Sequence, residues 1–141
     1  MSIKWIGFLR IVVGVFFLAQ GLSKVQWYTT SEYLQTNLDR YGVNAHPVTQ
    51  WYQEKVARPY IEVWSRLIPS GEIAIGIALI LGLFVQPTLI ISSLLLLNFY
   101  VATGKIFQLT FFSDPYAMLL IVIVLLLLFN KSGNVWAVKV K

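Results

Sequence analysis

Long apolar runs, interrupted by few charged positions, dominate the chain. The longest run holds thirty-two consecutive uncharged residues between Glu72 and Lys105, which exceeds the ~20 residues that one bilayer crossing needs. Gln86-Pro87 interrupts this run near its middle, and proline disfavours helix in the residue before it. We therefore expect two antiparallel helices joined by a tight turn at Gln86-Pro87.

Two further apolar segments flank this hairpin, so the pattern predicts four membrane-spanning helices. The expected spans are about 5–23, 69–86, 88–105 and 115–130, all within a single membrane domain, residues 1–141. We expect Pro69 in the first turn of the second span. The last span is short, about 22 Å at 1.5 Å per residue. The predicted fold class is an all-α, polytopic membrane protein built as a four-helix transmembrane bundle.

The segment between the first two spans, residues 25–67, is the long loop of this bundle. It contains eight tryptophan and tyrosine residues and none of the nine phenylalanines, and aromatic rings with a polar tip prefer the headgroup level of a bilayer. We expect the loop to lie on the membrane surface with one or two interfacial helices, the first capped by Ser31, the second opened by Pro47 and kinked at Pro59. Two roles stay open, an interfacial anchor or an aromatic lid formed by Trp51, Tyr52, Tyr60 and Trp64.

The composition agrees with a membrane protein and excludes several classes of function. Only 12% of the residues are charged and 57% are hydrophobic, whereas a soluble domain carries about a quarter charged residues. The chain has no cysteine and one histidine. A disulfide scaffold, a thiolate metal site and a bis-histidine haem site are therefore excluded within one copy of the chain, and we predict no metal.

The distribution of lysine and arginine predicts the orientation in the membrane. With an even number of spans, both termini share one side, which carries four lysines and no acidic residue: Lys4, Lys131, Lys139 and Lys141. Positively charged loops favour the cytoplasmic side, so both termini are expected there and the long loop is expected to be extracytoplasmic. The net charge of +5 then reflects topology, and no nucleic-acid partner is predicted.

Small and polar residues form a stripe on one face of the first span. The members recur at steps of three and four residues, which is helical spacing: Arg10, Gly14, Phe17, Gly21 and Lys24. The second span has a comparable seam that contains Glu72 and Gly76, and small residues allow helices in a membrane to approach closely. We expect the two seams to face each other, with an ion pair between Lys24 and Glu72 at the extracytoplasmic end.

Four other polar residues are candidates for a site. Arg10 lies inside the first span, where a charge is costly, and its candidate partners are the end of the last span near Asn130, backbone carbonyls or lipid phosphate. Asn98 and Lys105 share one face of the third span, and Asn98 acts either as interhelical hydrogen-bond glue or as a ligand contact. The role of His46, a lone loop histidine, stays undetermined.

These residues make the chain resemble the DoxX-like family of small four-helix bacterial membrane proteins. The resemblance lies in three groups of residues: Leu9-Arg10-Ile11, Gly14, Phe17, Gly21 and Lys24; Gly71-Glu72-Ile73, Gly76, Leu79 and Leu81-Gly82-Leu83; and Ala102-Thr103-Gly104. It implies a multi-pass protein of the bacterial cytoplasmic (inner) membrane, associated with quinone-linked or thiol-linked redox systems. One branch is similar to the small subunit of thiosulfate:quinone oxidoreductase. For individual residues, the resemblance concerns Arg10, Lys24 and Glu72.

Three functional hypotheses follow. The first is a redox-associated subunit with a quinone or lipid pocket at the extracytoplasmic end, where Lys24, Glu72 and Lys105 would lie under the aromatic lid. The second is a non-catalytic accessory subunit packed on a larger respiratory or photosynthetic complex. A small transporter ranks last, because the chain lacks a matched pair of broken helices.

The expected partners are the lipid bilayer and other membrane subunits or a redox partner. No nucleotide-binding loop, Ser–His–Asp set or HExxH motif is present in the sequence. We therefore predict no catalytic residue, and intrinsic enzyme activity is left open.

Overall fold

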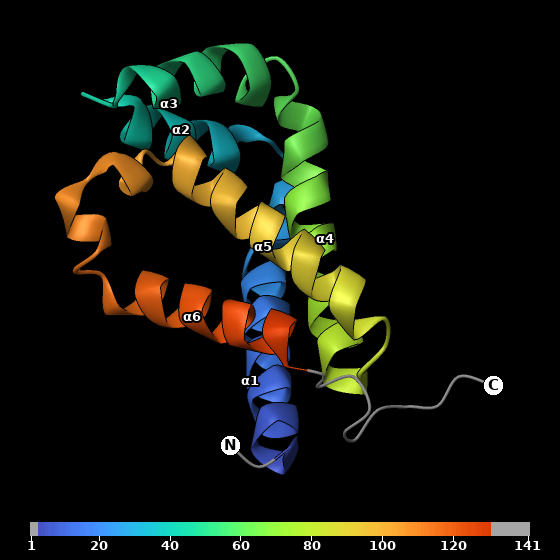
Figure 1. The fold of residues 1–141 in the computed structure, drawn as a ribbon. Helices are drawn as coiled ribbons and strands as arrows, with labels where there is room; N and C mark the ends of the chain where they lie inside the picture. The colour runs from blue at the N-terminus through green and yellow to red at the C-terminus, as the bar shows by residue number, and fades with distance from the viewer. Residues whose placement is uncertain (1–2, 131–141) are drawn as a thin grey trace.

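The computed structural model describes residues 3–130, and every regular element within this range is helical. The α-helices are α1 (Ile3–Ser23), α2 (Glu32–Gly42), α3 (Pro47–Tyr52), α4 (Ile61–Leu81), α5 (Val85–Ala102) and α6 (Pro115–Phe129). Short 3-10 segments η1 (Val25–Tyr28), η3 (Lys105–Phe107) and η4 (Leu109–Phe111), and the π-helical η2 (Gln53–Ala57), lie between them. Figure 1 shows α1 beside α4, with α2 and α3 gathered at one end. The all-α prediction is confirmed.

α1 and α4 pack backbone against backbone along the predicted glycine seam. A Cβ atom on Gly76 would lie 2.6 Å from the Leu18 nitrogen, and one on Gly21 would lie 2.9 Å from the Pro69 carbonyl oxygen. Neither position has room for a side chain. Val13 and Leu79 are buried in the core next to this seam. The prediction that the two seams face each other is correct.

α4 begins eight residues earlier than the sequence predicts. It runs from Ile61, so Pro69 lies inside the helix and is fully buried, and Glu72 lies well inside the helix instead of near its start. The prediction of a helix start near residue 69 is therefore wrong, whereas the residue at which the membrane span begins stays a prediction. A proline in a helix interior removes one backbone hydrogen bond, and here the Pro69 carbonyl oxygen packs closely against the Gly21 position of α1.

The turn between α4 and α5 also differs from its prediction. Gly82 ends α4 in the left-handed conformation, with φ of 72°, and Phe84 precedes α5 with φ of 45°. Glycine adopts this conformation without steric cost and commonly ends helices. Pro87 lies in the first turn of α5. The N–H groups of a first turn have no acceptor within their own helix, so proline removes no backbone hydrogen bond there. The predicted turn at Gln86-Pro87 is therefore placed four residues too late.

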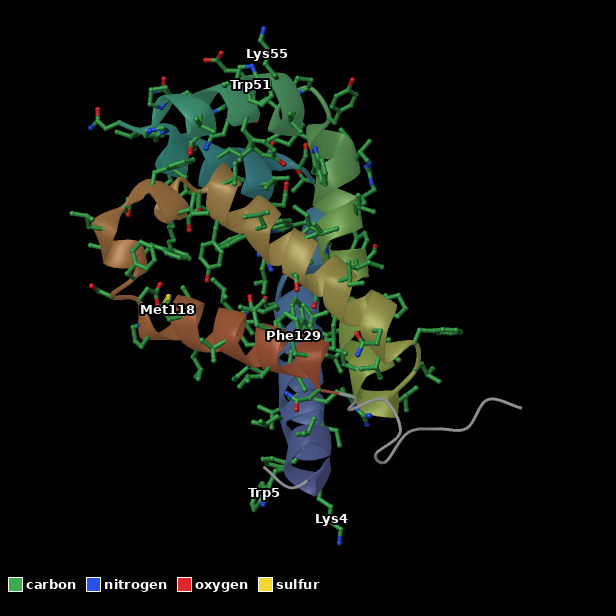
Figure 2. All side chains as sticks on the ribbon, in the orientation of Figure 1. Lys4, Trp5, Trp51, Lys55, Met118 and Phe129 are labelled. Carbon is green, nitrogen blue, oxygen red and sulfur yellow. The ribbon has the colours of Figure 1, made fainter. Side chains whose placement is uncertain are left out.

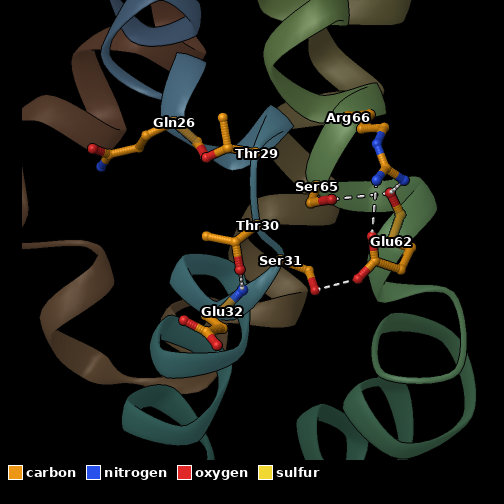
Figure 3. Close-up of polar contacts among 8 residues, drawn as sticks. All are labelled: Gln26, Thr29, Thr30, Ser31, Glu32, Glu62, Ser65 and Arg66. Carbon is orange, nitrogen blue, oxygen red and sulfur yellow. Dashed lines mark hydrogen bonds and ion pairs between the residues drawn. The ribbon is translucent and has the colours of Figure 1, made fainter.

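The long loop forms a helical cap over one end of the α1–α4 pair. We call α2, α3 and η2 the cap, and the end that they cover the loop end. α2 begins after Ser31 as predicted, yet Ser31 donates its hydroxyl to the Glu62 carboxylate, and Thr30 Oγ1 accepts from the Glu32 backbone N–H at 3.2 Å (Figure 3). Pro47 opens α3 as predicted. The expected break near Pro59 is a turn between η2 and α4.

α5 and α6 meet at the end of the molecule opposite the cap and separate toward the loop that joins them (Figure 1). Gln86 Nε2 donates to the Leu128 carbonyl oxygen at 3.4 Å where the two helices meet. Toward the loop end, Tyr100, Phe111 and Ala117 form a separate cluster of buried side chains. The segment between α5 and α6 thus fills part of the space that the diverging helices leave.

Three described helices are long and apolar enough to cross a membrane: α1, α4 and α5. α6 is shorter, with 15 residues, about 22 Å at 1.5 Å per residue, against a hydrocarbon core of about 30 Å. A fourth crossing therefore stays a prediction. So does the orientation of the termini, because three of its four lysines, Lys131, Lys139 and Lys141, lie outside the described residues.

The glycine seam makes a specific stability prediction. Gly76→Ala would force α1 and α4 apart, because Leu18 backbone and side-chain atoms and the Gly14 carbonyl all lie within 2.8 Å of the new methyl group. We expect a loss of about 1–3 kcal/mol, typical of overpacking, seen as a lower melting temperature in detergent. Gly71→Ala is the matched control on the same helix, because nothing lies within 4 Å of its Cβ position. Equal effects of the two variants would contradict the seam.

Candidate functional site

A salt bridge between Lys24 and Glu72 joins α1 to α4 at the loop end. Lys24 Nζ donates to both carboxylate oxygens of Glu72, at 2.5 and 2.7 Å. The two side chains are only 18% and 11% exposed. The ion pair predicted from the matching depth of the two residues is therefore present. Because Lys24 directly follows α1 and Glu72 lies on α4, the bridge fixes the relative height of the two helices.

The salt bridge lies beside the core of the cap. Lys24 Nζ is 5.8 Å from the centre of the Trp27 ring, a favourable cation–π distance. Trp27 is buried with Leu34 and Leu38 of α2 and Ala57 of η2. The charged pair thus has the bundle on one side and an apolar cap core on the other.

The cap is fastened to the end of α5 by side chains of α3 and η2. Thr49 Oγ1 donates to the Val101 carbonyl oxygen at 3.0 Å, and Gln53 Nε2 donates to the Ala102 carbonyl oxygen at 2.9 Å. Both side chains are buried. The last carbonyls of a helix have no partner within that helix, so these bonds satisfy the exposed end of α5 and seat α3 on it.

Tyr52 completes this attachment through Asn98. Its hydroxyl donates to Asn98 Oδ1, so the residue predicted as part of the lid contacts the residue predicted inside the third span. Burial raises the pKa of Tyr52 above its ordinary value of 10.0, and the hydrogen bond to Asn98 partly opposes this. The phenol is therefore neutral at physiological pH and remains a donor.

The four predicted lid residues divide into two pairs. Tyr52 and Trp64 face inward, and Trp64 Nε1 donates to the Val56 carbonyl oxygen at 3.1 Å. Trp51 and Tyr60 are about 60% exposed. Figure 2 shows Trp51 and Lys55 on the outer side of the cap, at the end remote from Lys4 and Trp5. Half of the expected lid, Trp51 and Tyr60, is therefore exposed on the outside of the molecule at the loop end.

The remaining predicted site residues lie apart from the salt bridge. Arg10 is fully buried, more than three helical turns of α1 from Lys24. Lys105 begins η3 after α5 and forms no ion pair with Glu72 within the described part of the chain. His46 precedes α3, where its Nδ1 accepts from the Val48 N–H at 3.3 Å and its ring stacks on Phe107 at 4.1 Å. These contacts give His46 a structural role between α3 and η3.

An apolar cavity of about 170 Å³ lies between α5 and α6 toward the loop end. Its lining comes from both helices and the segment between them: Ser93, Leu96, Leu97, Tyr100, Ile106, Phe111, Ile121, Val124 and Leu125. Leu97 and Leu125 are 51% and 45% exposed. The cavity therefore opens on the outer face of the helices, which in a bilayer is the lipid side.

Sequence reasoning did not identify the residues of this cavity. Ser93, Leu96, Leu97 and Tyr100 recur at the spacing of one helical face, which was a usable signal. That spacing does not distinguish a cavity wall from a helix contact or a lipid-facing surface.

In the described range, no group of three or more histidine, aspartate or glutamate residues has the arrangement of a metal site.

Comparison with known proteins identifies a family that covers nearly all of the described residues. A family model described as DoxX matches residues 6–130, which include α2 to α6 and nearly all of α1. Neither a search of curated proteins nor a search of solved structures gave a match.

The salt bridge yields a stability prediction with an internal control. Lys24→Met leaves the Glu72 carboxylate buried without a cation, so we expect a loss of about 3–5 kcal/mol, as for other broken buried pairs. The double variant Lys24→Met/Glu72→Leu should recover much of this loss, because both charges are gone. Arg66→Met breaks the exposed pair with Glu62, whose side chains are 56% and 60% exposed (Figure 3), and should cost less than about 1 kcal/mol. Melting in detergent measures all three, and a double variant that is no more stable than Lys24→Met would contradict the coupling.

Tyr52 makes the stability of the cap depend on pH. Its pKa is raised in the folded state, so its contribution is fully present below the unfolded pKa of about 10 and is lost as the pH rises through the folded pKa. We expect wild type to melt above Tyr52→Phe by a constant margin below about pH 10, and this margin to shrink at higher pH. A margin that grows with alkaline pH would contradict the assignment.

Proposed function

The chain belongs to the DoxX family of membrane proteins, and from this premise we propose that it is an integral membrane subunit of a quinone-linked redox system. The chain has no cysteine, so in a thiol-linked system the reactive sulfur would belong to a partner protein. We place the protein in the bacterial cytoplasmic membrane, with the loop end on the extracytoplasmic side.

The α5–α6 cavity is the observation that carries this proposal. A quinone reaches its site laterally from the bilayer, and the cavity opens between the half-exposed side chains of Leu97 and Leu125. Its walls are apolar apart from Ser93 and the hydroxyl of Tyr100. Ligand pockets commonly combine apolar and aromatic walls with a few polar groups, which suits a ring that carries carbonyl oxygens.

Two polar contacts serve this site by fixing the helices against one another at the loop end. The Lys24–Glu72 bridge fixes α1 against α4, and Asn98 connects α5 to Tyr52 of the cap. Lys24 Nζ has three hydrogens and uses two of them on Glu72. We propose that its third hydrogen, together with Lys105, favours negative charge at the loop end when a quinone is reduced nearby.

The exposed side chains of the cap and of the first turns of α4 favour a second candidate, an accessory subunit of a larger membrane complex. Trp51, Tyr60, Val63 and Leu67 are each more than half exposed. Exposed apolar side chains at one end of a molecule often mark an interaction site. Under either candidate, this surface is where a redox partner or a neighbouring subunit would dock.

Quinone retention tests the proposal. We expect protein purified in mild detergent to retain quinone, and to bind an added short-tail quinone with a raised melting temperature. Ser93→Phe fills the cavity and should lower the retained quinone about tenfold or more, because the ring loses its space. Ile91→Phe, on the exposed face of the same helix, is the matched control and should retain wild-type levels.

Two outcomes would reject the proposal. The first is a purified protein that neither retains nor binds any quinone. The second is a quinone-free protein that elutes as a stable complex with another membrane polypeptide, which would support the accessory subunit.

A further inference from the structure

We infer that the α5–α6 cavity accepts a single six-membered quinone ring, with a carbonyl oxygen that accepts a hydrogen bond from Tyr100, and discriminates against a fused two-ring quinone. This inference rests on the proposed function, because it names the chemical class of quinone for the same site. Four observations support it: the size of the cavity, the Tyr100 hydroxyl in its wall, the aromatic surface next to this hydroxyl and the position of the opening.

The size of the cavity matches one aromatic ring. Its volume is about 170 Å³, and an apolar protein cavity of about 150 Å³ is large enough to bind benzene. A second fused ring would need α5 and α6 to move apart where their walls converge. Val124 is 2% exposed at this convergence and packs in the main core, so that wall cannot give way without disturbing the bundle.

The Tyr100 hydroxyl is a donor in the wall of the cavity. Tyr100 is 7% exposed, and within residues 3–130 its hydroxyl takes part in no hydrogen bond. The hydroxyls of Ser92, Ser93 and Thr103 instead bond to carbonyls of their own helix. Tyr100 lines the cavity and its hydroxyl is not among the enclosed polar atoms, so it can donate to a ligand that brings an acceptor into the cavity.

The aromatic wall next to this hydroxyl suits a flat ring. Phe111 packs edge-to-face on Tyr100, with ring centres 4.9 Å apart and planes at 82°. This leaves aromatic surface from η4 and aliphatic side chains from α6, such as Ile121, around the same space. An aromatic or quinoid ring packs favourably on such surfaces.

The opening allows a long tail to remain outside the cavity. Leu97 and Leu125 flank it and are about half exposed, and the neighbouring face of α5 presents further exposed side chains, including Leu94 at 61%. A tail can therefore lie along α5 in the hydrocarbon while only the ring enters. A cavity of one-ring size is thus sufficient for a membrane quinone.

A paired titration tests the inference. Purified full-length protein in detergent is titrated with a benzoquinone and a naphthoquinone that carry the same decyl tail, and binding is followed by the rise in melting temperature. We expect the benzoquinone to bind about tenfold more tightly, because the second ring overpacks the site. Ile121→Ala enlarges the cavity and should bring the two affinities together.

Tyr100→Phe tests the hydrogen bond separately. It should weaken benzoquinone binding about three- to tenfold, the effect of one lost hydrogen bond. The ligand-free protein should melt at the wild-type temperature or above it, because the hydroxyl has no protein partner to lose. Tyr33→Phe, at a 45% exposed tyrosine of α2, is the matched control and should bind as wild type.

The outcomes separate this inference from the proposed function. Equal wild-type affinity for the two quinones, or unchanged benzoquinone binding by Tyr100→Phe, would overturn the single-ring site while the quinone-linked function stands. Failure of both quinones to bind would overturn the function, and the inference with it.

Discussion

The close contact between α1 and α4 is the constraint on which the rest of the structure depends. Glycines let the two backbones touch, and the Lys24–Glu72 bridge sets their relative height. In lipid, apolar side chains gain nothing by leaving one apolar solvent for another, so helix association depends on close packing and polar contacts. The α1–α4 pair has both kinds of contact. α5, α6 and the cap are then positioned against this pair by fewer, more local contacts.

The parts of this arrangement that depend on charge and residue size could be predicted from the sequence. Lys24 and Glu72 are charged residues at the ends of apolar runs, and their depths along two antiparallel helices match without knowledge of the fold. Gly14 and Gly21 recur at helical spacing in the first span, and Gly76 follows Glu72 at helical spacing in the second, which marks a close contact. The α-helical class follows from the length of the apolar runs. Whether Lys24 and Glu72 also act on a ligand stays a prediction.

The parts that depend on tertiary packing could not be predicted. Pro69 has the local properties of a helix start, but α4 continues through it because its backbone packs closely on Gly21 and the cap packs on the preceding turns. The turn at Gly82 was missed because a neighbouring proline gave the more obvious signal. The cavity arises from the divergence of α5 and α6, and a pattern of leucine, serine and tyrosine along one helix cannot report an angle between two helices.

The continuous α4 has a mechanical consequence. Its first turns pack against the cap and its later turns pack closely against α1. Pro69 lies between these two parts. Proline has no N–H to offer the Ser65 carbonyl, and bends in helices concentrate at such positions. We therefore expect α4 to bend most easily near Pro69, at the height of Gly21, while the turns packed on the glycine seam keep their register with α1.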